Sequence, residues 1–232
     1  MRTDTCTGPS HNDHQKLEAL LYTIVPYRKE ALRLLIKEAN DVAIELHLPE
    51  RLPITQTDLV DVVIGPPKVA AIIGGIGAIG TSNYEYCVAV GGKLSYITSS
   101  KLDSETARKE LKAKYLWPIE RRNTNAAYQM ATQWLAAIQM DVKGIERDCK
   151  VHVWSWTPDG VDPKHFVPIY WVVWKRPDGP VASVELLEPT HLLGHLNVHH
   201  PEYVLRKPVE ITNMDVLLSQ TNMSEAGLNK RQ

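Results

Sequence analysis

Four of the nine histidines of this chain lie within ten residues, in the segment HLLGHLNVHH. Histidine is a common zinc ligand, and Glu185 and Glu188 lie close by in sequence, so a metal-dependent hydrolase is one hypothesis. Along a strand, however, four residues span about 13 Å, which is too far for two histidines to bind one ion. Gly194 and Asn197 disfavour the helix that would bring them together. We therefore expect exposed histidines on an edge strand or loop, and the alternative is a metal site formed by His191, His195, His199 and His200.

A glycine pattern precedes the middle of the chain. The stretch AAIIGGIGAIG places Gly75, Gly77 and Gly80 in the spacing GxGxxG. In a dinucleotide-binding fold this pattern must open a helix, whose N-terminus holds the pyrophosphate. The residues that follow, TSNYEYCVAV, alternate instead like a strand. We therefore expect a tightly packed or flexible entry to a hairpin, and no cofactor.

The aromatic residues are six Trp and nine Tyr against one Phe. Rings with a polar rim are favoured at half-buried faces and interfaces. Strand periodicity puts His152, Trp154 and Trp156 on one side of VHVWSW. In PIYWVVW, it separates Tyr170 and Trp174 from Trp171. If the two strands pair, Trp154 and Trp156 are expected beside Tyr170 or Trp174. These rings form either a two-sided core or a platform that binds a partner, and the chain length favours the core. If they form a platform, the candidate binding residues are Trp154, Trp156, Tyr170 and Trp174.

No pattern in the sequence predicts nucleophilic catalysis. There is no GxSxG, and no pair of carboxylates stands among apolar residues. The cysteines, Cys6, Cys87 and Cys149, have no CxxC spacing, and Cys87 and Cys149 are expected to pair only in an exported protein. The leading hypothesis is therefore a non-enzymatic binding or structural module.

Several helices are predicted to hold these residues in place. The first runs from Pro26 to Leu48, with an apolar stripe three or four residues apart. Residues 49–80 are rich in Pro and Gly and resist assignment. A hairpin with a Gly-Gly turn and a short helix over 104–115 follow. The clearest helix covers 123–149, where Asn123–Asn125 offers an N-cap and one face carries Ala127, Ala131, Trp134, Ile138, Val142 and Ile145.

The C-terminal half is rich in strands separated by short turns such as KRPDGP, which favours antiparallel neighbours. The predicted fold class is therefore α+β, with long amphipathic helices packed on an antiparallel meander. We expect one domain over 15–222, disordered tails over 1–14 and 223–232, and a short last helix over 214–220. No internal repeat is clear in the sequence.

Composition sets the expected partners. The formal net charge is −1, so neither nucleic acid nor an anionic membrane is expected as a partner. No uncharged apolar window is long enough to cross a bilayer. The first fifteen residues lack the apolar region of a signal peptide, so the chain as written is expected in the cytoplasm, and outside it if translation starts upstream.

Four stretches together resemble a group of uncharacterised proteins from verrucomicrobial bacteria: TSNYEY, NTNAAYQMATQWLAAIQMDV, HFVPIYWVVW and LRKPVEITNMDVLLSQTN. Members of that group begin with an export signal, and the resemblance assigns no functional residue. The order of helix and meander is also similar to cystatin-like and PepSY-like modules. That second likeness implies another protein or peptide as the partner.

Overall fold

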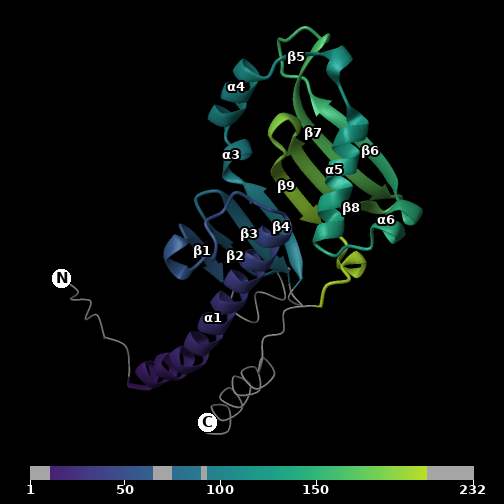
Figure 1. The fold of residues 1–232 in the computed structure, drawn as a ribbon. Coiled ribbons are helices and arrows are strands. Elements are labelled where there is room, and N and C mark those ends of the chain that lie inside the picture. The colour runs from purple at the N-terminus through teal and green to yellow at the C-terminus, as the bar shows by residue number, and fades with distance from the viewer. Residues whose placement is uncertain (1–10, 65–74, 90–92, 208–232) are drawn as a thin grey trace, which may run out of the picture.

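The computed structural model describes residues 11–64, 75–89 and 93–207, and within them one nine-stranded antiparallel sheet spans both halves of the chain (Figure 1). The fold class is α+β, as predicted from the sequence. The strands are β1 (Asp61–Ile64), β2 (Gly75–Gly80), β3 (Tyr84–Ala89), β4 (Leu94–Ser99), β5 (Trp117–Pro118), β6 (Lys150–Trp156), β7 (His165–Arg176), β8 (Gly179–Leu187) and β9 (Leu192–Val198). The helices are α1 (His11–Glu45), α3 (Ser100–Asp103), α4 (Glu105–Lys114), α5 (Thr124–Ala137) and α6 (Val142–Asp148).

The order of the strands shows two similar halves. The sheet runs β1-β2-β3-β4-β9-β8-β7, and β5 and β6 lie one after the other along the far side of β7. A helix followed by a four-stranded meander, α1 with β1 to β4, is thus repeated as α5 and α6 with β6 to β9. The last strands of the two meanders, β4 and β9, pair at the centre of the sheet. The sequence did not reveal this repetition because the two halves use different side chains for the same layout.

Helices α1 and α5 pack on the same face of the sheet. Helix α1 contacts β1 to β3, and α5 contacts β6 to β8. Apolar side chains from both helices belong to one core cluster, which includes Leu35 and Ala131 and reaches Ile97 and Leu196 at the central pair of strands. Burial of this shared apolar surface is the main force that holds the two halves together.

The first helix is longer than predicted. It begins at His11, and Pro26 lies in its interior and not at its first turn. Proline removes one backbone donor, and helix-forming residues on both sides allow the helix to continue through it. The C-terminal end agrees with the prediction: the helix ends at Glu45, and His47 takes a φ of +50°, in the left-handed region that often ends helices.

The region of the clearest predicted helix contains two helices. Helix α5 is capped as predicted, since the Asn123 side chain accepts a hydrogen bond from the Ala126 N–H. It ends at Ala137, because Gln139 takes a φ of +60°. The Asp141 side chain then caps α6 by accepting from the Gly144 N–H. A continuous helix to residue 149 was therefore wrong, and a local N-cap signal at Asp141 marks the break.

The glycine pattern, expected as a tightly packed or flexible entry to the hairpin, itself forms strand β2. A Cβ on Gly77 would lie 2.3 Å from the Val63 carbonyl oxygen, so β1 and β2 can approach only with glycine there. The predicted hairpin is β3 and β4, and the predicted short helix is α4, capped by Ser104. The Gly91-Gly92 turn and the predicted helix over 214–220 lie outside the described residues.

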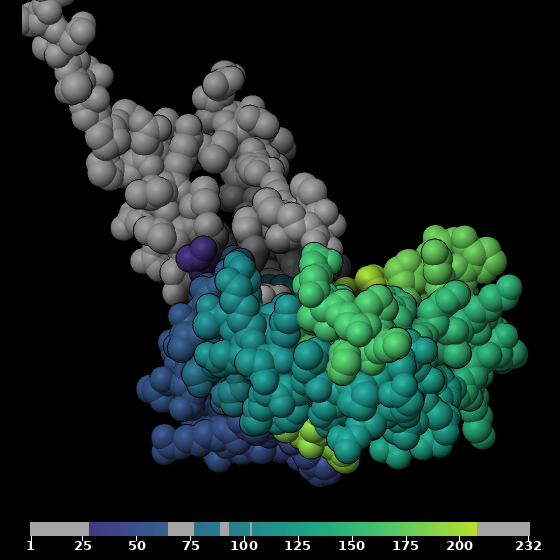
Figure 2. Space-filling view, turned by 90° about the horizontal axis from the view of Figure 1, so that it is seen from above, coloured from purple at the N-terminus to yellow at the C-terminus, as the bar shows by residue number. Residues whose placement is uncertain are grey.

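The segment after β4 links the two halves. Helices α3 and α4 and the short strand β5 follow one another before α5 begins. Figure 2 shows this teal segment between the blue surface of the first half and the green surface of the second. Within the described residues, no helix is both long and apolar enough to cross a membrane.

Candidate functional site

The face of the sheet opposite α1 and α5, here called the outer face, carries a row of aromatic and polar side chains. The register places residues from five neighbouring strands directly side by side in this row: Trp154, Trp171, Glu185, His195 and Thr98. Residues paired across an antiparallel sheet point to the same face, so these five side chains form one line from the edge strand β6 to the centre.

Two tryptophans stack at the edge of this row. The rings of Trp154 and Trp171 have centroids 6.2 Å apart and planes inclined by 15°. Trp171 is half-buried, whereas Trp154 keeps 46% of its surface exposed. An exposed tryptophan supported by a second ring is a rigid apolar surface that is available for contact.

Helix α4 covers the neighbouring part of the outer face. The Arg108 guanidinium lies 5.6 Å from the centroid of the Trp156 ring and 5.7 Å from that of Trp171. It also donates a hydrogen bond of 2.9 Å to Oε1 of Glu185, which is nearly buried. Leu111 of α4 and Tyr115, the residue that follows this helix, pack against the same cluster of rings and aliphatic side chains. Because α4 covers this end, the open part of the aromatic surface is at Trp154.

The four candidate aromatic residues separate between the two faces. Trp154 and Trp156 lie on the outer face, whereas Tyr170 and Trp174 are buried in the core beneath α5. The expectation that Trp154 would stand beside Tyr170 or Trp174 is wrong, because the register pairs it with Trp171. The alternation within each strand was predicted correctly, but the register between the strands cannot be predicted from it. The two-sided core and the exposed ring are thus both present.

The buried Tyr170 has a structural role. Its hydroxyl accepts a hydrogen bond of 3.0 Å from the backbone N–H of Asn123, the residue that caps α5. Burial raises the pKa of Tyr170 to about 12, so the phenol stays protonated over the physiological pH range. Tyr170 therefore fixes the start of α5 against the sheet.

The structure does not bring the four candidate histidines together. His191 occupies a left-handed turn position before β9, and His199 follows the end of that strand. His195 lies on the outer face, where its Nδ1 is 2.8 Å from the Thr98 hydroxyl and its ring stacks on Tyr96. The Nδ1 atom of His200 lies 2.7 Å from Oε1 of Glu202. Among the described residues, no three His, Cys, Asp or Glu side chains are placed to hold a metal ion.

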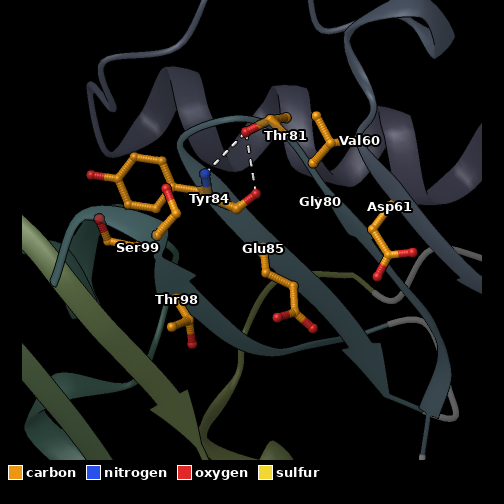
Figure 3. Close-up of a pocket in the computed structure, with 9 residues that line it drawn as sticks. Val60, Asp61, Gly80, Thr81, Tyr84, Glu85, Thr98 and Ser99 are labelled. Atoms are coloured by element: carbon orange, nitrogen blue, oxygen red, sulfur yellow. Dashed lines mark hydrogen bonds between the residues drawn. The ribbon is translucent and has the colours of Figure 1, made fainter. Parts of the chain in front are cut away.

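A first depression of about 260 Å³ lies at the end of the first half (Figure 3). The carboxylates of Asp61 and Glu85 both line it, on either side of Gly80. The Glu85 carboxylate accepts a hydrogen bond of 2.7 Å from the Tyr96 hydroxyl. The Thr81 hydroxyl donates to Glu50 at 2.6 Å and accepts from the Tyr84 N–H at 3.0 Å, which shapes the adjoining turn. This depression is acidic, and its polar groups already have partners within the fold.

A second depression, of about 590 Å³, lies where α6 meets the start of β6 and the end of β7. Its charge is the opposite of the first. Lys150 and Lys175 are paired in the sheet register, so both side chains stand on the face that carries His152 and Trp154. Like charges directly opposite each other are unfavourable. Within the described part of the chain, neither ammonium group has a carboxylate partner. The lining residues are Arg147, Asp148, Cys149, Lys150, His152, Lys175, Arg176 and Pro177.

The arginines beside this depression differ from its lysines. Arg147 pairs with Asp148 at 2.7 Å, and Arg176 pairs with Asp178 at 2.8 Å. Their charges are therefore compensated locally, and the uncompensated positive charge of the depression is that of Lys150 and Lys175.

The two described cysteines, Cys87 and Cys149, are free thiols and do not pair. Burial raises the pKa of each thiol above its ordinary value. A protonated thiol is a poor nucleophile, so neither residue has the environment of a reactive cysteine.

The sequence did not predict the roles of three residues at the outer face. Trp171 could have been found, because its alternation sets it apart from Tyr170 and Trp174. Glu185 was considered only as a carboxylate near the histidines, and its ion pair with Arg108 has no local signal because it joins positions 77 apart. In comparisons with protein-family models, curated proteins and solved structures, nothing matched the chain.

Proposed function

We propose that this protein is a binding module that holds an extended segment of another protein against its outer face at Trp154. The observation that carries the proposal is the exposed Trp154 ring, stacked on Trp171 at the free edge of the sheet. Large aromatic side chains with a rigid support supply much of the binding energy at protein interfaces.

The surroundings of Trp154 favour a protein segment as the occupant. The ring lies on strand β6, with a basic depression at one end and the covered cluster under Arg108 at the other. A strand with apolar and charged side chains in line suits an extended chain whose side chains alternate. The two uncompensated lysines add a preference for negative charge in that chain.

Selection from a library of random linear peptides displayed on phage tests this proposal. The expected result is a set of enriched peptides that bind the purified protein in calorimetry. Their Kd should rise about tenfold or more in Trp154→Ala, the size of effect that an interface hot spot shows. A Trp154→Phe variant should recover part of the affinity, because a ring remains.

The matched control is Ile44→Ala, which removes another exposed apolar side chain, 55% exposed, from α1. It should leave the Kd unchanged. Enrichment of no peptide, or equal affinity of the wild type and Trp154→Ala, would overturn the proposed function.

A further inference from the structure

Strand β6 is an open edge of the sheet. One edge of β6 pairs with β7 over Lys150–Trp156. Among the described residues, no strand pairs with its other edge. No other backbone hydrogen bond within the described chain reaches residues 150–156. Lys150, Val151, His152 and Trp154 are all exposed, so no side-chain layer covers this edge. Its outward backbone donors and acceptors are therefore free to pair with another chain.

The two faces of this edge differ in chemistry. Lys150, His152 and Trp154 alternate on the outer face, and Val151 and Val153 point to the other face. Val151 is 43% exposed, so an apolar side chain has room to pack beside it. A strand added here meets a lysine, a histidine and a tryptophan on one side, and two valines on the other.

The bulge in the pairing limits the length of the usable edge. The register shifts between Ser155 and Trp156, which turns the strand away after six regular residues. Of the other edge strands of the described sheet, β1 has four residues and begins with Asp61, and β5 has two. Strand β6, with seven residues, is thus the longest of the three edge strands and the one with the basic flank.

From these observations, we infer that the protein binds an acidic segment of its partner by adding it as an antiparallel strand to the outer edge of β6. This inference rests on the proposed function and names its binding mode and ligand class. Antiparallel addition continues the pattern of every pair in the sheet and gives the better-aligned hydrogen bonds. Acidic side chains then lie opposite Lys150 and His152, an aromatic one lies opposite Trp154, and β-branched ones lie beside Val151 and Val153.

The geometry specifies a probe sequence. Read antiparallel to β6, the aromatic residue comes first, and the two acidic residues follow at alternate positions. The acetylated and amidated peptide TFVEVET has this pattern, and TFVKVKT is its basic counterpart. A third peptide carries N-methyl groups on the alternate amides of TFVEVET that face β6, and a fourth carries them on the amides that face away.

Fluorescence polarisation with labelled peptides measures the affinities, and amide exchange by NMR locates the contact. We expect TFVEVET to bind about tenfold more tightly than TFVKVKT, since the charge opposite Lys150 and near Lys175 is reversed. Methylation toward β6 should abolish binding, and methylation on the far side should not. Alternate amides of residues 150–155 should gain protection, while those of β1 should not change.

A charge exchange gives a reciprocal test. Lys150→Glu with Lys175→Glu should reverse the preference, so that TFVKVKT binds better than TFVEVET. The control, Lys29→Glu with Lys101→Glu, makes the same change in net charge at two other exposed positions and should keep the original preference.

The outcomes separate this inference from the proposed function. If neither probe binds, if both bind equally, or if the amides of β6 are unaffected, strand addition is overturned. If phage-selected peptides still depend on Trp154 but tolerate methylation and charge reversal, the binding module stands and the strand mode does not. Loss of both results would overturn both.

Discussion

Arg108 on α4 and Glu185 on β8 form an ion pair of 2.9 Å that fixes α4 to the outer face of the sheet. The Glu185 side chain is 10% exposed and that of Arg108 is 28% exposed. The guanidinium also lies over the rings of Trp156 and Trp171. The Arg108 side chain thus covers one end of the aromatic surface, and its charge compensates the nearly buried carboxylate of Glu185.

Loss of this arginine should destabilise the fold. Arg108→Ala removes the charge beside Glu185 and the contact with two rings, so the free energy of unfolding should fall by about 2–3 kcal/mol. Adding Glu185→Gln should restore part of it, because the neutral amide no longer needs a cation. Urea denaturation measures both variants. Lys109→Ala, which breaks an exposed pair with Glu105, is the control and should change stability little. Equal effects of Arg108→Ala and Lys109→Ala would contradict the assignment.

The two stacked tryptophans should differ in their effect on stability. Trp171→Ala opens a hole in the half-buried cluster and should lower the free energy of unfolding by about 2–3 kcal/mol. Trp154→Ala removes a ring that is already largely in water and should cost less than about 1 kcal/mol. Chemical denaturation of the two variants checks this. A larger loss for Trp154 would mean that its ring supports the fold and is not primarily a contact surface.

A buried carboxylate on α1 should make stability depend on pH. Glu38 is 1% exposed, neither of its oxygens accepts a hydrogen bond, and Arg206 lies 3.6 Å away. Burial raises the pKa of Glu38, which Arg206 partly offsets. Because its pKa is raised, the Glu38 carboxyl group holds its proton more tightly in the folded protein than in the unfolded chain. The free energy of unfolding therefore falls as pH rises from the ordinary pKa of 4.5 through the raised value.

The variant Glu38→Gln should therefore gain stability relative to the wild type as pH rises through that window, by on the order of 1 kcal/mol at neutral pH. Thermal unfolding from pH 4 to 8 measures the difference. Glu45→Gln is the control, since Glu45 contacts the same arginine at 2.7 Å but is more exposed. It should show no such gain. A wild-type protein that becomes more stable than Glu38→Gln as pH rises would show that the carboxylate is compensated.

Gly77 should tolerate no side chain. A Cβ there would meet the Val63 carbonyl oxygen at 2.3 Å and the Leu35 side chain at 3.2 Å. Gly77→Ala must therefore push β1 away from β2 and should cost about 1–3 kcal/mol. Gly80→Ala is the matched control, because its nearest contact would be an ordinary 3.5 Å. Denaturation and amide exchange in β1 check the pair. Similar stability of the two variants would refute the role of close packing at Gly77.

The sequence predicted the elements with short-range signals. Asn123 and Ser104 are N-cap residues, and both begin helices where the sequence placed them. The alternation in VHVWSW and PIYWVVW was also correct within each strand. The break at Gln139 was missed because the apolar positions on both sides keep a helical spacing, and only the cap at Asp141 marks the boundary.

The features that define the candidate site depend on long-range pairing. The partner of Trp154 is set by the register of β6 and β7, and the alternation within each strand does not determine whether Trp171 or Trp174 lies beside it. Arg206 shows the same limit: it lies 3.1 Å from Asp41 and 2.7 Å from Glu45, so it compensates the acidic end of α1. Negative charge near the C-terminal end of a helix is unfavourable for the helix dipole, and no local pattern indicates the arginine far along the chain that compensates it.

The central position of β9 has a consequence for biosynthesis. As the chain leaves the ribosome, β4 is complete about a hundred residues before the strand that pairs with it. The edge of β4 must therefore wait unpaired while helices α3 to α6 and strands β5 to β8 are made. Because closing so distant a contact is slow, we expect the sheet to join only at the end of synthesis.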